Sequence, residues 1–174
     1  MMRLRNLICL IVALAVTSSA AITIPIEVGT GADSAGLYIE WSDGYIADFL
    51  VFFDETITGE GLLDTVDTGL GDNFVVTKTY YEGFGAAIDG IYYNDGFIEH
   101  FDPGYVAGED WWHYWTKDTG QTDWLSSSVG CSSRTVSEGD MDSWIYGRAG
   151  APIPEPTTIA LLGLGGLLLR RRRA

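Results

Sequence analysis

The run Trp111-Trp112-His113-Tyr114-Trp115 is the most unusual local feature of the sequence and could contact a ligand. Side chains on a β-strand alternate between its two faces, so Trp111 and Trp115 would share one face and Trp112 and Tyr114 the other. One face would pack in the core, and the other could stack against the apolar faces of sugar rings. The candidate stacking residues are Trp111, Trp115 and Trp124. Alternatively, these aromatic side chains fill the core of a small secreted domain without disulfides.

Acidic residues beside turn-forming residues recur and offer the oxygen ligands that Ca²⁺ prefers. They stand at Gly71-Asp72-Asn73, Asn94-Asp95-Gly96, Glu109-Asp110 and Asp140-Met141-Asp142. None has the spacing of an EF-hand loop, and Asp, Asn and Gly are also the residues that turns require. We therefore expect no resident cofactor, with Ca²⁺ as the alternative.

The remaining residue patterns do not indicate catalysis. His100 and His113 are the only histidines, and no His-Glu-x-x-His motif or Cys/His cluster accompanies them, which disfavours a zinc site. The serines at 126–128 and 132–133 lack a Gly-x-Ser-x-Gly elbow. Carboxylates are so numerous that no pair of them indicates a glycosidase. We expect no catalytic residues, no metal ligands and a non-enzymatic protein.

The N-terminal residues are typical of a secretory signal peptide. Arg3 and Arg5 precede the apolar run Leu7–Val16, and the small residues at 17–21 supply a cleavage site. A helix needs about 20 residues to span a bilayer, so this run is too short for a transmembrane segment. We predict a signal peptide at residues 1–21; the alternative is the first buried element of the domain.

The C-terminal residues fall into three parts in a fixed order. Pro154-Glu155-Pro156 comes first, an apolar run follows, and four arginines precede Ala174. The predicted membrane segment includes Thr157, Ile159, Leu161, Leu162, Leu164, Leu167, Leu168 and Leu169. The predicted cytoplasmic cluster is Arg170, Arg171, Arg172 and Arg173, held there by the positive-inside preference. At about 1.5 Å per residue the run is short, which suits a transient anchor.

This tail resembles the PEP-CTERM sorting signal of exported bacterial proteins, through its Pro-Glu-Pro, its apolar run and its terminal arginines. The resemblance implies recognition by an exosortase, a membrane-embedded cysteine transpeptidase that would cut near residues 154–156. It also implies a Gram-negative-type bacterium that makes exopolysaccharide, which becomes a candidate partner beside the secretion machinery and the inner membrane. The alternative is a plain C-terminal membrane anchor.

Charge and cysteine content limit which partners and disulfides the part between the two ends can have. The net charge is −14, and every acidic residue lies between Glu27 and Glu155, whereas most basic residues lie at the two ends. Phosphate contacts need clustered Lys and Arg, so we expect no nucleic-acid partner. Cys131 is the only cysteine outside the predicted signal peptide, so no internal disulfide forms; we expect a small buried residue, with pairing between chains as the alternative.

Residues 22–150 are predicted to form one acidic, aromatic-rich domain that is rich in β-structure. We expect strands at 36–41 and 45–53 around a turn at 42–44, a helix at 56–67, a strand at 74–81, a hairpin at 85–93 with its turn at Asp89-Gly90, and last strands at 111–116 and 143–146. Thr58 would cap the helix, Gly69 would end it, and Leu62, Leu63 and Val66 would form its apolar side.

The predicted order, a hairpin followed by a helix and then by further strands, is that of a β-grasp-like α+β domain with one short helix. Hydrophobic helices would flank this domain at both ends of the chain, at residues 1–21 and 153–174. A β-sandwich is the alternative, favoured if residues 56–67 are not helical.

The body of the chain also resembles the C-terminal domain of transcobalamin-type proteins. An aromatic strand (112–115), a Gly-Asp turn (139–140) and a short aromatic strand (144–146) carry the resemblance. The usual Val-Asn-Gly of that family is missing here. The resemblance favours the β-grasp arrangement and does not imply cobalamin binding.

Together these features predict an exported cell-surface or extracellular-matrix protein with a structural or association role. In transit it would lie in the inner membrane, and after cleavage by the exosortase it would reach the surface or matrix. The alternative is a glycan- or small-ligand-binding module that uses its surface aromatic residues.

Overall fold

The computed structural model describes residues 24–105 and 110–152. The predicted signal peptide, the predicted sorting segment and the flanking helices assigned to them lie outside these residues. Within the described ranges, no helix is both long and apolar enough to cross a membrane.

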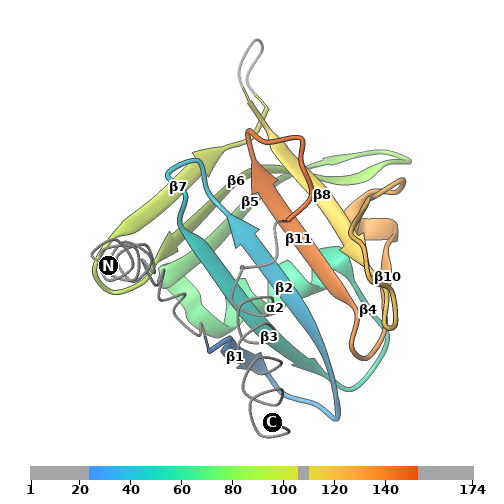
Figure 1. Cartoon of the computed structure of the whole chain (residues 1–174). Helices are drawn as coiled ribbons and strands as arrows, with labels where there is room; N and C mark the ends of the chain where they lie inside the picture. The colour runs from blue at the N-terminus through green and yellow to red at the C-terminus, as the bar shows by residue number, and fades with distance from the viewer. Residues whose placement is uncertain (1–23, 106–109, 153–174) are drawn as a thin grey trace, which may run out of the picture. The chain divides into compact units, whose positions relative to one another are not determined.

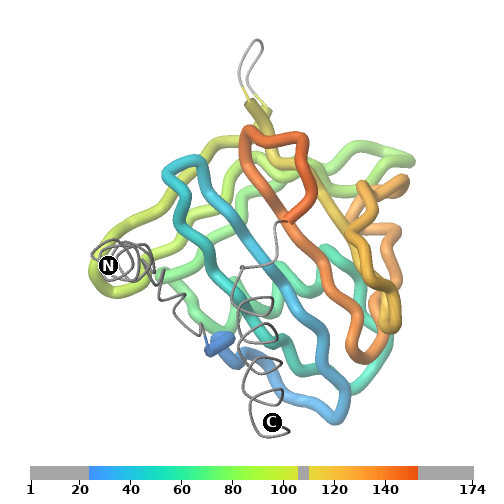
Figure 2. The backbone as a smooth tube through the Cα atoms, in the orientation of Figure 1, coloured from blue at the N-terminus to red at the C-terminus, as the bar shows by residue number. Residues whose placement is uncertain are grey.

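A six-stranded mixed sheet forms the larger layer, with the strand order β1-β3-β2-β11-β8-β9. Its strands are β1 (Ile26–Gly29), β3 (Ile46–Phe53), β2 (Asp33–Glu40), β11 (Met141–Tyr146), β8 (Trp112–Lys117) and β9 (Leu125–Ser126). β1 is parallel to β3 and β2 is parallel to β11, whereas the other neighbours are antiparallel. The two central strands therefore come from opposite ends of the domain, blue beside red in Figures 1 and 2.

An antiparallel three-stranded sheet packs behind the larger one in the view of Figure 1. It consists of β5 (Phe74–Tyr81), β6 (Gly85–Asn94) and β7 (Glu99–Pro103). A separate two-stranded pairing joins β4 (Ile57–Thr58) to β10 (Thr135–Val136). The domain is thus mostly β-structure, as predicted, and its larger sheet mixes parallel and antiparallel pairs.

The helix α2 (Gly59–Leu70) begins and ends three residues later than the predicted range 56–67, because Ile57 and Thr58 belong to β4. The Thr58 side chain accepts a hydrogen bond from the Gly61 N–H at 3.0 Å, which confirms the predicted N-cap. Gly69 does not end the helix; its missing Cβ lets the helix lie against Val28, where a side chain would collide. The C-cap is Gly71, whose φ of +56° is readily adopted only by glycine, and η2 (Gly71–Asn73) follows.

The core lies between the two sheets and the helix. The predicted apolar side of α2, formed by Leu62, Leu63 and Val66, is fully buried. These side chains belong to one cluster with Phe49 of β3 and Phe74 of β5, whose rings meet edge to face at 5.4 Å. The helix therefore joins the larger sheet to the smaller one.

The predicted turn at Asp89-Gly90 is wrong. β6 runs through both residues, and the pairing with β5 shifts register there, opposite Thr77 and Lys78. Both neighbouring isoleucines, Ile88 and Ile91, are buried in the core, which holds the strand in one continuous run. The local turn preference of Asp-Gly is therefore overridden by burial on either side of it.

The tight turns lie instead at the two ends of β6, and each contains a glycine with positive φ. Gly83 lies between β5 and β6 with φ +79°, and Gly96 lies between β6 and β7 with φ +92°. The predicted hairpin at residues 36–53 is confirmed by antiparallel pairing of β2 with β3.

Candidate functional site

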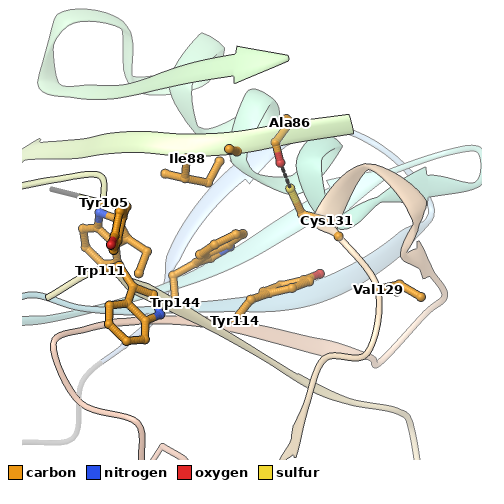
Figure 3. A pocket seen from close by; sticks show the side chains of 11 residues that line it. Ala86, Ile88, Tyr105, Trp111, Tyr114, Val129, Cys131 and Trp144 are labelled. Carbon is orange, nitrogen blue, oxygen red and sulfur yellow. Dashed lines mark hydrogen bonds between the residues drawn. The ribbon is translucent and has the colours of Figure 1, made fainter. Parts of the chain in front are cut away.

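An aromatic pocket of about 360 Å³ opens between β6 of the smaller sheet and β8 and β11 of the larger sheet. Most of its wall is apolar or aromatic. The described residues that line it are Ala86, Ala87, Ile88, Tyr105, Trp111, Trp112, Tyr114, Val129, Gly130, Cys131 and Trp144. Figure 3 shows the Trp144 and Tyr114 rings between Trp111 at one end and Cys131 at the other.

One wall of the pocket is built by the pairing of β8 with β11. Tyr114 lies directly opposite Trp144, so their side chains share a face of the sheet, and their rings stack at 4.5 Å with 19° between the planes. Trp112, two residues earlier on β8, contacts Trp41 edge to face at 6.2 Å and is buried. The side of β8 that carries Trp112 and Tyr114 therefore faces the pocket and core.

The mouth of the pocket holds Trp111 and Tyr105, whose ring centroids lie 6.1 Å apart. Trp111 is 46% exposed and Tyr105 is 70% exposed. β8 begins at Trp112, so Trp111 lies before the strand and strand alternation does not govern its direction. Of the candidate stacking residues, Trp111 alone lines the pocket, while Trp115 and Trp124 are half-buried elsewhere.

The opposite wall holds a loop against the start of β6. Ser132, in η3 (Cys131–Ser133), accepts a hydrogen bond from the Ala86 N–H at 2.8 Å and donates one to Glu60 at 2.6 Å. Glu60 also pairs with Lys78 at 3.2 Å. Helix, strand and loop are thereby tied together, which positions Cys131 beside Ala86 in the pocket wall.

Cys131 is a buried free thiol, in agreement with its predicted role. Its sulfur lies 3.9 Å from the Ala86 carbonyl oxygen. Burial raises its pKa to about 11, with a smaller contribution from the Glu60 carboxylate. The thiol is therefore protonated at neutral pH and is a poor nucleophile.

A buried polar network anchors Tyr114 beneath the pocket. Its hydroxyl donates to the Asp142 carboxylate, which is fully buried, and Arg134 donates to the same carboxylate at 3.4 Å. Arg134 also pairs with Asp118 at 2.7 Å and with Asp140 at 3.2 Å. Burial raises the pKa of Asp142 and that of Tyr114. The hydrogen bond from the Tyr114 hydroxyl to Asp142 therefore holds the ring in place.

Two of the acidic residues singled out as calcium candidates, Asp95 and Asp140, accept hydrogen bonds from backbone N–H groups of turns, and a third, Glu109, lies outside the described residues. One carboxylate oxygen of Asp95 accepts the N–H groups of Phe97 and Ile98, each at 2.8 Å. Asp140 accepts the N–H groups of Thr119 at 2.8 Å and Ser137 at 2.9 Å. In residues 24–105 and 110–152, no group of three or more His, Cys, Asp or Glu is placed to hold a metal ion.

Sequence reasoning missed a second cluster, around His100. This buried imidazole stacks on Tyr45 at 3.7 Å, and its Nδ1 lies 2.6 Å from a carboxylate oxygen of Asp43. Asp95 lies on the other side, 3.9 Å from Nε2. His100 and Asp43 are 57 residues apart in the sequence, so no local sequence pattern predicts their contact. The cluster joins the turn after β2 to the turn after β6.

Comparison with known proteins identifies the tail. Residues 152–173 match the family model of the PEP-CTERM protein-sorting motif. The chain carries a PEP-CTERM sorting signal. No curated protein matches the chain.

The PEP-CTERM match covers Pro154, Glu155 and Pro156, the apolar run and all four terminal arginines, as predicted. These residues lie beyond the described part of the structure. The motif implies an exported, surface-associated protein that an exosortase processes. The comparison concerns the tail alone, so the resemblance of the body to the transcobalamin-type domain stays a prediction.

Proposed function

We propose that this protein is delivered to the bacterial cell surface or extracellular matrix and acts there by association, without catalysis. Residues 1–21 would direct it to the secretion machinery, and an exosortase would cut the tail near Pro154-Glu155-Pro156. The PEP-CTERM signal supports the export route. The composition of the aromatic pocket supports the non-enzymatic role of the domain.

The pocket offers surfaces for contact, and its described residues include few groups that acid–base catalysis uses. Among the described residues that line it, none is Asp, Glu, His, Lys or Arg. The thiol of Cys131 is protonated at neutral pH, and the hydroxyl of Tyr114 is donated to Asp142. General acid–base catalysis needs a titratable group within reach of the substrate, so this lining favours binding.

We also infer that the larger sheet with α2 is the β-grasp-like part of the domain. The hairpin β2–β3 precedes α2 in the chain, and β8 and β11 follow it. β2 and β11 pair in parallel at the centre, with β3 and β8 outside them. The sheet β5–β7 is then an insertion between the helix and the last strands.

The sorting step is tested by replacing Glu155 with Ala. If the Pro-Glu-Pro motif is read by an exosortase, the Glu155→Ala protein is exported but stays uncut in the inner membrane. Glu138→Ala is the matched control, since Glu138 is an exposed acid of the domain. Fractionation followed by immunoblotting of both variants gives the result. Release of the Glu155→Ala protein as efficient as that of the control would reduce the tail to an anchor or spacer.

Deleting Arg170–Arg173 perturbs the same tail differently. Four positive charges oppose passage across the membrane, so without them the chain is expected to slip through unprocessed. Full-length protein in the outer fractions is the expected result. Normal cleavage of this variant would show that the arginines are not needed for the stop.

Binding of a small ligand is a second candidate function, and the pocket is the observation that favours it. Its volume lies within the range of about 300–1,000 Å³ that is usual for ligand sites. A flat glycan platform would need Trp111, Trp115 and Trp124 on one accessible face. Of these three, Trp111 is the most exposed and lies at the pocket mouth.

A further inference from the structure

We propose that the aromatic pocket binds a small organic cation of the trimethylammonium type. The proposal deepens the second candidate function and does not depend on the sorting route. It rests on the ring faces around the pocket, the hydrogen-bonding groups of the lining and the charges nearby.

Five aromatic side chains line the pocket: Tyr105, Trp111, Trp112, Tyr114 and Trp144. The face of an aromatic ring carries negative partial charge and attracts a cation within about 6 Å of its centre, tryptophan most strongly. The Tyr114 and Trp144 rings stack on each other in one wall, and the exposed residues Tyr105 and Trp111 lie together at one end of the pocket (Figure 3). A ligand that enters therefore meets aromatic rings both in the wall and at the mouth.

The lining has few groups that could replace the water around a sugar. Among its described residues there is no Asn, Gln, Ser or Thr and no charged side chain. The Tyr114 hydroxyl already donates to Asp142. The indole N–H groups of Trp112 and Trp144 are buried and have no hydrogen-bond partner among the described residues, so the lining offers at most these two buried donors. Burying the many hydroxyls of a sugar here would leave most of them unpaired, whereas methyl groups around a cationic nitrogen need no hydrogen bonds.

The surroundings favour positive charge over negative. Two cations close to the pocket walls are engaged: Lys78 pairs with Glu60 and Asp64, and Arg134 pairs with three aspartates. The whole chain carries −14, so a negative potential surrounds the domain. An anion would meet that potential with no basic side chain in the described lining to receive it. A compact cation gains from both the rings and the net charge.

The test compares choline with 3,3-dimethylbutan-1-ol, which has the same shape without the charge. The full chain is titrated with each compound, and tryptophan fluorescence is followed, since three of the six tryptophans line the pocket. Choline is expected to bind roughly tenfold more tightly than the neutral compound, the range of a desolvated cation–π contact. Equal affinity of the two would overturn the cation proposal. Binding of glucose or cellobiose in preference to choline, or of none of these probes, would overturn it as well.

Two leucine substitutions locate the binding. Trp111→Leu keeps an apolar side chain at the mouth but removes its ring face, so choline affinity should fall about fivefold while that of the neutral compound changes little. Trp124→Leu is the matched control, because Trp124 lies outside the lining residues, and it should leave both affinities unchanged. Equal losses in the two variants would place the binding elsewhere. Neither variant touches the tail, so processing by the exosortase is scored separately.

Discussion

Replacing Gly59 with Ala tests how α2 is seated against the pocket wall. Gly59 is the first residue of the helix and is buried. A Cβ there would collide with the Tyr114 hydroxyl and would lie 2.6 Å from a carboxylate oxygen of Asp142. Neither atom is at the free end of a mobile side chain, since the Tyr114 ring is stacked on Trp144 and Asp142 is held by Arg134. The methyl group therefore has no room unless the network moves.

Whether Gly59→Ala raises or lowers the free energy of unfolding shows whether helix propensity or tertiary packing dominates at this position. Helix propensity alone predicts that Gly59→Ala stabilises the fold, by at most about 1 kcal/mol at this first helical position. Overpacking costs about 1–3 kcal/mol, and disturbing the hydrogen bond from Tyr114 to the Asp142 carboxylate adds about 1.5 kcal/mol. We therefore expect a net loss of about 2 kcal/mol in the free energy of unfolding.

Urea denaturation followed by circular dichroism gives the measurement. Thr68→Ala is the control for helix propensity, because Thr68 is exposed on the same helix and should gain a few tenths of a kcal/mol. Combining Gly59→Ala with Tyr114→Phe removes one of the two colliding atoms, so the double variant should lose less than the sum of the single losses. A more stable Gly59→Ala protein would refute the contact between the helix start and the pocket wall.

Three further predictions concern burial and charge. Leu63→Ala should lower the free energy of unfolding by about 2–5 kcal/mol, because Leu63 is fully buried against the sheets; a neutral effect in urea denaturation would contradict this orientation of α2. Burial alone would raise the pKa of Asp43, but hydrogen bonds from His100 and from the Tyr45 N–H lower it. Its stabilising contribution is therefore fully present above the unfolded-state pKa of about 3.9 and is lost as the pH falls through the lower pKa of the folded protein, so Asp43→Asn should destabilise the protein more at pH 7 than at pH 2.5. Cys131 should react slowly with a thiol reagent at pH 8 in the folded protein and rapidly in urea, with Cys131→Ser as the blank, because burial raises its pKa to about 11; equally fast labelling in both states would contradict its burial.

The features that the sequence predicted well are those formed by neighbours in the chain. The sorting signal is contiguous, so its three parts are visible without a fold. The Thr58 cap and the apolar side of α2 follow from spacing within a single helix. The hairpin of β2 and β3 follows from two β-rich runs around a short turn. In each case the interacting groups are a few residues apart, and local geometry is enough.

Other local preferences were decided by packing. Asp89-Gly90 has the sequence of a hairpin turn, yet Ile88 and Ile91 are both buried, and the strand continues through it. Gly69 has the sequence of a helix stop, yet its use is to bring the helix close to Val28. Free energies of burial exceed the roughly 1 kcal/mol that separates local backbone preferences, so tertiary contacts prevail.

The sequence by itself determined the sorting signal of this protein, its acidic character and most of its helices and strands. Only the tertiary structure decided where the aromatic residues act. Trp112, Tyr114 and Trp144 form a pocket wall because β8 pairs with β11, and Ala86 closes the other side from a different sheet. His100 of β7 meets Asp43, which lies in the turn after β2, in the same way. Strand register and sheet packing are non-local, so residue types and spacing along the chain do not specify which side chains meet across them.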